Sequence, residues 1–277
     1  MISSCQLPKW SHAVLRHHVP ETVQIMNKRE RYRVIADLLR EDGYVSVDVL
    51  SAKLAVSKAT IRRDLREFGA QGLLTRTHGG AAFSGRTYEV PLRYRRGERE
   101  GEKRRIAAVA ASRVTEGAVI GLTGGTTTTE VARRLPARGT LTVVTNALNI
   151  AADLALRPNV RLVDTGGIAR PVSFELTGPI AEHTVSRYHL DLLFLGVDGI
   201  DPVNGCTTHD DGEAQINRAM VLRADRVVVV ADGSKIGRRA FAQICGIDSV
   251  AEVITTDVAE EERLQALRTA GVAVVQV

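Results

Sequence analysis

The 277-residue sequence has few cysteines, few aromatic residues and no long apolar run. Its three cysteines, Cys5, Cys206 and Cys245, lie far apart, which excludes a disulfide framework and favours a reducing compartment. The longest apolar run, residues 227–231, is far shorter than the ~20 residues needed to cross a bilayer. Charged residues and prolines interrupt residues 1–25, where a secretory signal would lie. We therefore expect a cytoplasmic protein without a membrane partner.

Aromatic residues make up 4% of the chain and hydrophobic residues 44%, so the core must consist mainly of aliphatic side chains. Charged residues, at 25%, are typical of a globular protein, which excludes a disordered or collagen-like chain. Their distribution is uneven. Residues 1–100 contain 18 Lys and Arg against 11 Asp and Glu (net +7), and residues 101–277 contain 19 against 21 (net −2). This asymmetry predicts a module that binds a polyanion, joined to a second domain.

Changes of pattern divide the chain into four parts. Residues 1–25 have no periodicity, and we expect either a disordered extension or a chain that truly starts at Met26. Residues 26–83 are expected to form a winged helix-turn-helix, residues 84–102 a linker and residues 103–277 an α/β domain. In this last part mostly apolar strands alternate with helices, which predicts a doubly wound parallel sheet with helices on both faces.

The basic part carries the pattern of three short helices, the first over residues 28–42. The second is expected to begin after Ser46 and to bury Val49, Leu50 and Leu54. Ser57 is placed to cap the third helix, residues 58–68, because its hydroxyl can accept a hydrogen bond from a free N–H there. A tight turn before a third helix is typical of a helix-turn-helix, which inserts that helix into the major groove of DNA.

The start of this third helix is rich in hydroxyl and basic side chains, which suit phosphate anchoring and guanine recognition. A hairpin is predicted over residues 73–83 as a wing, and Asp64 is placed to orient an arginine. A helical bundle with a solvated basic face is the alternative, but cap, turn, basic helix start and wing occur together. We predict that the residues that contact DNA are Ser57, Lys58, Thr60, Arg62, Arg63, Arg66, Arg76 and His78.

Five polar or glycine-containing turns follow apolar strands of the acidic part. Because ligands gather at the carboxyl ends of parallel strands, these turns predict one pocket. The turn at 123–129 combines glycines, threonine hydroxyls and a helix start, which can cradle a phosphate, although such a turn alone is more often structural. We predict a ligand site made of Gly125, Thr126, Thr127, Thr128, Asn146, Gly166, Gly167, Asp198, Gly199, Glu213 and Lys235.

Four of these side chains have specific expected roles. Asn146 and Asp198 suit the hydroxyls of a sugar, and Lys235 suits a phosphate or carboxylate. Glu213, at a helix start, is equally compatible with a ligand contact and with a cap stabilised by the helix dipole.

Other polar pairs are given structural interpretations. Arg170 and Glu175 either select the ligand or form a local ion pair, and we favour the ion pair. Cys206 and His209 amount to half a metal site without a second pair, so we expect no metal and no cofactor. No spacing indicates a catalytic triad.

Residues 31–65, with Ser57-Lys58-Ala59-Thr60-Ile61-Arg62-Arg63-Asp64-Leu65 at their end, resemble the helix-turn-helix signature of the DeoR family of bacterial transcriptional regulators. Residues 76–81 resemble the wing of the family. The resemblance to the effector domain of the family covers residues 125–128, 144–146, 165–167, 196–201 and 232–235. In place of the acidic residue that many members carry two positions before Gly-Thr-Thr, this chain has Thr123-Gly124.

This resemblance implies a domain related to ribose-5-phosphate isomerase that binds a phosphorylated sugar. It implies a regulator of a carbohydrate-metabolism operon, a repressor, that binds operator double-stranded DNA as a homo-oligomer, dimer or tetramer, and is not an enzyme. An alternative is a sugar-phosphate isomerase that uses Asp198, Glu213 and Lys235 as acid–base groups, against which the fused DNA module argues. A weaker alternative is a constitutive DNA-binding protein with an inert core.

Overall fold

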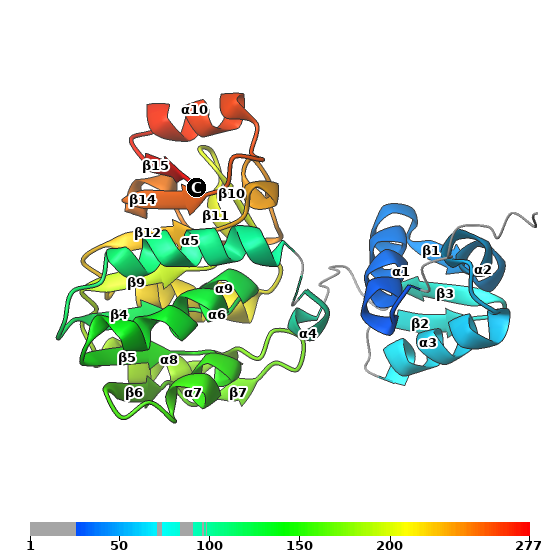
Figure 1. Ribbon diagram of the computed structural model, residues 1–277, viewed down its shortest axis with the longest axis horizontal. Coiled ribbons are helices and arrows are strands. Elements are labelled where there is room, and N and C mark those ends of the chain that lie inside the picture. Colours follow the sequence, from blue (N-terminus) through cyan, green and yellow to red (C-terminus); the bar gives the residue numbers. More distant parts are fainter. Residues whose placement is uncertain (1–25, 71–73, 84–90, 96, 98) are drawn as a thin grey trace, which may run out of the picture.

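The computed structural model describes residues 26–70, 74–83, 91–95, 97 and 99–277. Two folded units are visible in Figure 1, the N-terminal one in blue and cyan and the C-terminal one in green to red. The extension expected over residues 1–25 lies outside the described residues.

The N-terminal unit contains three helices and a small antiparallel sheet. Its elements are α1 (Lys28–Asp42), β1 (Tyr44–Ser46), α2 (Val47–Leu54), α3 (Lys58–Ala70), β2 (Leu74–Thr77) and β3 (Gly80–Phe83), and within the described residues the strand order is β1-β3-β2. A capping box between Asn27 and Glu30 starts α1, and Gly43 ends it at a φ of 68° that favours glycine. The Ser46 hydroxyl caps α2 by accepting the N–H of Val49 at 3.1 Å. The expected three helices and wing are therefore present.

One apolar core joins the three helices. The rings of Tyr32 on α1 and Phe68 on α3 meet edge to face at 4.4 Å between centroids. Helix α2 buries Leu50 and Leu54, as predicted. Val49 is 55% exposed, so the prediction that it points inward is wrong. The buried stripe of α2 runs through residues 47, 50 and 54, and position 49 lies outside that stripe.

The C-terminal unit is the predicted doubly wound α/β domain. Within the described residues a seven-stranded sheet has the order β15-β14-β12-β9-β4-β5-β6, and all neighbouring strands are parallel. The strands are β4 (Val119–Leu122), β5 (Leu141–Thr145), β6 (Val160–Asp164), β9 (Leu192–Leu195), β12 (Val227–Val230), β14 (Glu252–Thr255) and β15 (Ala273–Gln276). Every residue of β9 and β12 is buried because both faces of a parallel sheet are covered.

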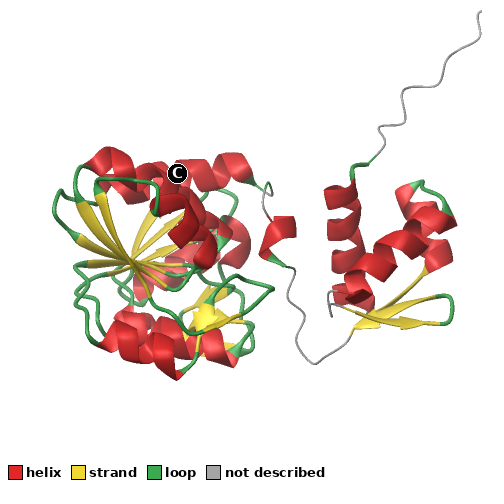
Figure 2. Ribbon diagram, turned by 90° about the horizontal axis from the view of Figure 1, so that it is seen from below, coloured by secondary structure: helices red, strands yellow, loops and turns green. Residues whose placement is uncertain are grey.

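Helices cover both faces of this sheet (Figure 2). One apolar cluster joins the sheet to α5 (Glu100–Ser112), α6 (Thr126–Arg134) and α7 (Leu148–Leu154). A second cluster joins the opposite face to α8 (Pro179–Ser186), α9 (Asp211–Val221) and α10 (Glu261–Thr269). No helix in the described part of the chain is long and apolar enough to cross a membrane.

Several short elements were not predicted from the sequence. They are α4 (Leu92–Arg95), α8, the paired strands β7 (Ile168–Ala169) and β8 (Leu176–Thr177), the antiparallel set β10 (Gly199–Asp201), β11 (Gly205–Thr208) and β13 (Ala242–Cys245), and three 3-10 turns, η1 (Leu135–Arg138), η2 (Gly233–Lys235) and η3 (Ile247–Ser249). Elements this short carry too few residues for a hydrophobic period to be recognised.

Part of the segment 84–102, where a linker was expected, is helical in the described residues. Helix α5 already begins at Glu100, and α4 packs on the C-terminal unit, because Leu92 is fully buried and its N–H donates to the carbonyl of Val172 at 2.8 Å. Two charged residues of this segment, Arg95 and Arg99, form ion pairs with carboxylates of the C-terminal unit.

Candidate functional site

Helix α3 has a basic face opposite its apolar one. Ile61, Leu65 and Phe68 are buried in the N-terminal core. The exposed basic side chains are Lys58, Arg62 and Arg66, at four-residue intervals, and Arg63 beside them. Residues four apart lie on one side of a helix, so this set forms the kind of stripe that a DNA groove requires.

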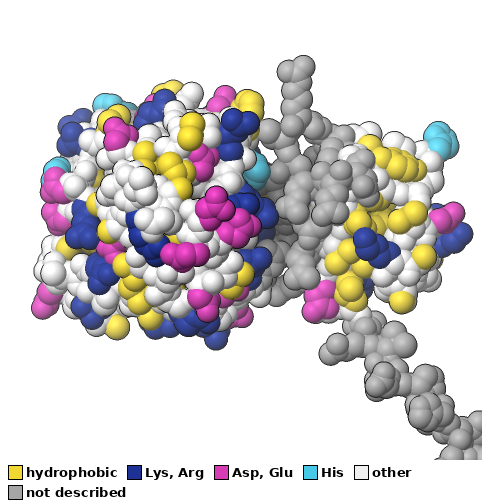
Figure 3. Space-filling view, turned by 90° about the horizontal axis from the view of Figure 1, so that it is seen from above, with side chains coloured by type: hydrophobic (Ala, Val, Ile, Leu, Met, Phe, Trp, Pro, Cys, Tyr) yellow, Lys and Arg dark blue, Asp and Glu magenta, His cyan; other side chains and the backbone are white. Residues whose placement is uncertain are grey.

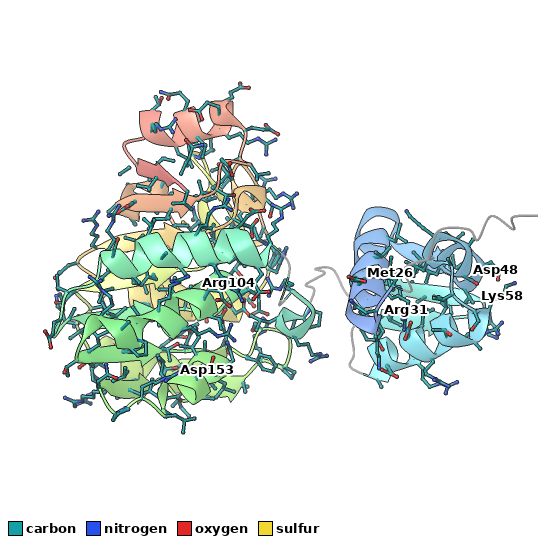
Figure 4. The ribbon with its side chains drawn as sticks, viewed as in Figure 1. Met26, Arg31, Asp48, Lys58, Arg104 and Asp153 are labelled. Carbon is teal, nitrogen blue, oxygen red and sulfur yellow. The ribbon has the colours of Figure 1, made fainter. Side chains whose placement is uncertain are left out.

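The predicted cap of α3 is present. The Ser57 hydroxyl accepts the N–H of Thr60 at 3.1 Å and lies 2.9 Å from the Thr60 hydroxyl. Lys58 pairs with Asp48 of α2, with Nζ 2.7 Å from Oδ1 (Figure 4), and this hydrogen bond lowers the pKa of Asp48. A DNA phosphate would therefore compete with Asp48 for Lys58.

Asp64 orients an arginine, as expected, but that arginine lies outside the exposed stripe. Its buried carboxylate accepts two hydrogen bonds from Arg31 of α1, 2.8 Å from Nε and 3.2 Å from Nη2. The Tyr32 hydroxyl donates to Glu67 at 2.7 Å nearby. Both contacts join α1 to α3 and hold the basic face in place.

The wing turn joins β2 to β3. His78 is exposed in this turn, and Gly79 follows with a φ of 87° that favours glycine. Strand β2 includes Arg76, whose side chain lies outside the described part of the structure.

A pocket lies at the carboxyl ends of β4, β9 and β12. From β4 the chain builds one side of the sheet through β5 and β6, then crosses over to β9, so β4 and β9 flank the point where the strand order reverses. The space inside the lining of this pocket, open mouth included, is about 550 Å³. Of the predicted site residues, those that line it are Gly125, Thr126, Thr127, Thr128, Asp198, Glu213 and Lys235.

The turn after β4 supplies one wall. Gly125 precedes α6 with a φ of 131°, and no side chain of the described residues caps this helix, so its first N–H groups remain available to an anion. The hydroxyls of Thr128 and Thr129 donate to the Gly125 carbonyl at 3.1 and 2.6 Å. These contacts hold the turn in its cradle shape.

Asp198 lies at the centre of the charged groups. Its Oδ1 is 3.3 Å from both Arg95 Nη1 and Lys235 Nζ, and its Oδ2 accepts the Thr208 hydroxyl at 3.1 Å. Burial alone would raise the pKa of Asp198, but the charges of Lys235 and Arg95 outweigh burial and hold it well below its usual value. Asp198 is therefore ionised at neutral pH.

Glu213 belongs to the pocket, and Asp210 takes the role of the cap. The Asp210 carboxylate accepts the Glu213 N–H at 3.0 Å and so starts α9. The buried Glu213 carboxylate also lies 3.1 Å from the Thr208 hydroxyl, whose single proton Asp198 and Glu213 share. Glu213 pairs with Arg170, which also lies 3.1 Å from Asp210. Arg170 therefore pairs with two carboxylates at the start of α9, and its expected ion pair with Glu175 stays a prediction.

The remaining predicted residues lie outside the pocket lining. Asn146 is fully buried beneath it and donates to Glu175 at 2.9 Å and to Asn217 at 3.2 Å, both of which line the pocket. Gly166 and Gly167 follow β6, two strands away from β4, where strands are spaced ~4.8 Å apart. Gly199 lies in β10, where a Cβ would come 2.4 Å from the Arg238 carbonyl. Gly199 therefore has a structural role, and the ligand contacts expected of Gly166 and Gly167 stay predictions.

Sequence reasoning missed other lining residues, which include Leu92, Arg95, Ser173, Thr208, Asn217 and Asp232. Arg95 belongs to the segment expected as a linker, and Asp232 to the stretch 232–235 that resembles the family's effector domain. No local signal links them to the pocket, because they come from separate segments of the chain.

Comparison with known proteins decides the family. The DeoR-like helix-turn-helix domain model matches residues 31–87, and the DeoR C terminal sensor domain model matches residues 98–257. The chain belongs to the DeoR family. It is 41% identical to the HTH-type transcriptional regulator GlpR of Haloferax volcanii over 251 residues, which cover 89% of this chain and 96% of that protein.

Two further relatives of this DeoR-family chain are named repressors. It is 35% identical to the putative aga operon transcriptional repressor of Escherichia coli O157:H7, covering 92% of this chain and 96% of that one. It is 34% identical to the glycerol-3-phosphate regulon repressor of Escherichia coli K12, covering 83% and 91%. The ribose 5-phosphate isomerase A structure from Methanocaldococcus jannaschii matches 48% of this chain and 52% of that one at 21% identity, with a TM-score of 0.37, too low to support an inference.

In this DeoR-family chain an acidic side chain from another segment contacts the turn at Thr123-Gly124. A Cβ at Gly124 would lie 2.3 Å from Cγ of Glu175, so glycine there makes room for this glutamate. The Thr123 hydroxyl accepts the N–H of Gly196 at 2.9 Å and joins the turns after β4 and β9.

The two described cysteines of this regulator lie on neighbouring strands. Cys206 faces Cys245 in the register of β11 and β13, and both are buried. Among the described residues, His189, Asp191 and Asp225 bring potential ligand atoms within 4.8 Å of one another, all exposed. Hydrogen bonds account for this group, since Asp225 pairs with His189 at 2.9 Å and Asp191 accepts the Val119 N–H at 2.7 Å.

Proposed function

We propose that this chain is a ligand-responsive repressor of a carbohydrate-metabolism operon that acts on the chromosome in the cytoplasm. The observation that carries the proposal is the combination of an exposed basic α3 with a polar pocket at the sheet's switch point in one chain. The repressor names of its relatives support the same direction. Residues 26–83 would bind operator DNA, and the C-terminal unit would sense the ligand.

The proposed DNA contact is made by α3 in the major groove and the wing beside it. The eight residues predicted from the sequence supply hydroxyls and positive charge for this contact. On the face shown in Figure 3, basic and acidic side chains alternate over the C-terminal unit, so positive charge is not concentrated there. Two-fold operators require two copies of such a helix, which supports a homo-oligomer, a dimer or tetramer.

The proposed ligand is a phosphorylated sugar. Its phosphate would accept from the N–H groups at the start of α6 and from Lys235, both at the pocket wall. Its hydroxyls would donate to the carboxylates of Glu175, Asp198 and Glu213. A ligand with an anionic end and several hydroxyls matches this division of charge.

Operator binding tests the DNA part. Duplexes that bind the full chain are first selected from fragmented genomic DNA. Arg62→Ala or Arg63→Ala is then expected to weaken binding to the selected duplex roughly 5- to 150-fold at physiological salt. This is the usual effect of losing one contact to a base. The control is Arg104→Ala, an exposed arginine of α5 that removes the same charge from the sensor unit (Figure 4). Unchanged affinity in both recognition-helix variants would refute the groove assignment.

Ligand binding tests the sensor part. Thermal unfolding is followed with glycerol 3-phosphate, fructose 6-phosphate, glucose 6-phosphate and inorganic phosphate. A ligand at 100 times its Kd stabilises the folded state by ~2.7 kcal/mol, and Thr126→Ala or Lys235→Ala should reduce this effect. If no sugar phosphate stabilises the protein saturably, the constitutive DNA-binding alternative gains support instead.

An isomerase is the second candidate, because the Thr208 hydroxyl lies 3.1 Å from carboxylates of both Asp198 and Glu213 in the pocket. A general base works best with a pKa near the operating pH, whereas that of Asp198 is held far below it. We therefore propose binding without turnover. Interconversion of glucose 6-phosphate and fructose 6-phosphate by the purified chain would reverse this choice.

A further inference from the structure

The segment that leads from the DNA-binding unit to the sensor forms part of the pocket wall. Leu92 and Arg95 of α4 line the pocket, and Leu92 is anchored by burial and by its bond to Val172. Arg99, just before α5, pairs with Asp232 on the same side at 3.2 Å. In Figures 1 and 2 α4 lies between the two units. Only residues 84–91 separate it from the last strand of the wing, β3.

Both cations that line the pocket contact the same protein carboxylate, that of Asp198. Arg95 and Lys235 approach the same atom, Asp198 Oδ1, both at 3.3 Å, which is longer than the 2.7–2.9 Å of a strong charge-assisted hydrogen bond. Among the described charged residues that line the pocket, these two cations face four carboxylates, those of Glu175, Asp198, Glu213 and Asp232. A phosphate group entering this pocket would compete with these carboxylates for the two cations.

The two cations differ in what moves with them. Lys235 belongs to η2, which directly follows β12 and is held by Asp232, whose carboxylate accepts the Ser234 N–H at 3.1 Å. Arg95 belongs to a four-residue helix outside the sheet. A change of partner at Lys235 would leave the backbone in place, whereas a change at Arg95 would act on α4 and so on the chain that leads to the DNA-binding unit.

We propose that Arg95 couples the two units: a phosphate ester bound in the pocket takes Arg95 from Asp198, and α4 then shifts and changes the placement of the DNA-binding unit. This inference rests on the proposed function. The Arg95–Asp198 contact holds the operator-binding state, and the ligand binds the state without it more tightly. That difference in affinity is what coupling between two sites requires.

Operator affinity without ligand tests the contact itself. Couplings of this kind amount to 5- to 150-fold, so Arg95→Ala and Asp198→Asn should each weaken binding to the selected duplex at least fivefold. Because both remove the contact between Arg95 and Asp198, the double variant should bind no more weakly than Asp198→Asn alone. Arg95→Lys, which keeps the charge, should recover part of the loss. The control is Arg93→Ala on the same helix, which is absent from the pocket lining and should bind like the wild type.

The ligand response supplies the second readout. A sugar phosphate that releases the wild type from the duplex should leave the Arg95→Ala complex unchanged, although it still stabilises this variant against unfolding. Two results would overturn the coupling and leave the proposed function intact. One is that the ligand releases Arg95→Ala from the duplex at the same concentrations as the wild type. The other is that Arg95→Ala and Asp198→Asn bind the operator as tightly as the wild type. A wild type that selects no duplex, or that no sugar phosphate stabilises, would overturn the proposed function and this inference with it.

Discussion

Replacing Asp64 with alanine is expected to unfold the DNA-binding unit at lower temperature while the sensor unit keeps its stability. The Asp64 carboxylate is 2% exposed and the Arg31 side chain 12%, and two hydrogen bonds join them. Breaking a buried ion pair by removing one partner costs ~3–5 kcal/mol, because the other charge stays in the interior without its counterion. Since Arg31 keeps slight exposure, the lower figure of ~3 kcal/mol is expected.

Amide hydrogen exchange on the full chain measures this effect unit by unit. A loss of ~3 kcal/mol should speed exchange of the slowest amides of α1 and α3 roughly 150-fold, at about 1.4 kcal/mol per factor of ten. Amides of β9 and β12 in the sensor should exchange as in the wild type. Operator affinity should fall because the basic face of α3 is held by this contact.

The matched control is Asp48→Ala, which breaks an ion pair of similar length on the surface. Asp48 and Lys58 lie 2.7 Å apart, but their side chains are 74% and 56% exposed, so solvent screens the pair and the loss should be much smaller than for Asp64→Ala. The double variant Asp64→Leu with Arg31→Met should recover most of the stability, because apolar residues replace both charges. If Asp64→Ala changes exchange no more than Asp48→Ala does, the assigned role of the buried pair is wrong.

Three further results are expected. Gly124→Ala should weaken sugar-phosphate binding, measured by calorimetry, since its Cβ would displace Glu175; full wild-type affinity would show that this close approach is unimportant. Lys235→Ala should reduce ligand-induced release from the operator in a fluorescence anisotropy assay, and an unchanged response would place the phosphate elsewhere. Burial lowers the pKa of His209 in the folded state. As the pH decreases through about 6.5, the unfolded state therefore binds a proton before the folded state does, and the free energy of unfolding should fall. His209→Asn should flatten this part of the curve of unfolding free energy against pH, and an unchanged curve would contradict the role assigned to His209.

Elements with strong local signals were predictable from the sequence. Ser46 and Ser57 cap the helices that follow them, and the apolar runs 192–195 and 227–230 are the buried central strands. A serine before a periodic helix and a strand of aliphatic residues act through neighbours in the chain. Such signals need no knowledge of the rest of the fold.

The site was predictable only in part. The turns after β4, β9 and β12 were expected to meet, and their residues do line the pocket. Asn146, which follows β5, was expected in the pocket as well. It lies beneath the pocket instead, where it donates to the side chains of Glu175 and Asn217. A polar residue after a strand can point into a pocket or support its wall, and local pattern does not distinguish the two.

By itself the sequence determined two units of opposite charge, the capped basic helix of one and the alternating strands and helices of the other. These features follow from periodicity, caps and composition, which act over a few residues. The tertiary structure alone decided that Asp64 holds Arg31, that Glu213 faces the pocket, and that Arg95 reaches Asp198 across more than a hundred residues of chain. Charges so far apart in sequence meet only when the strand order brings their segments to one edge of the sheet.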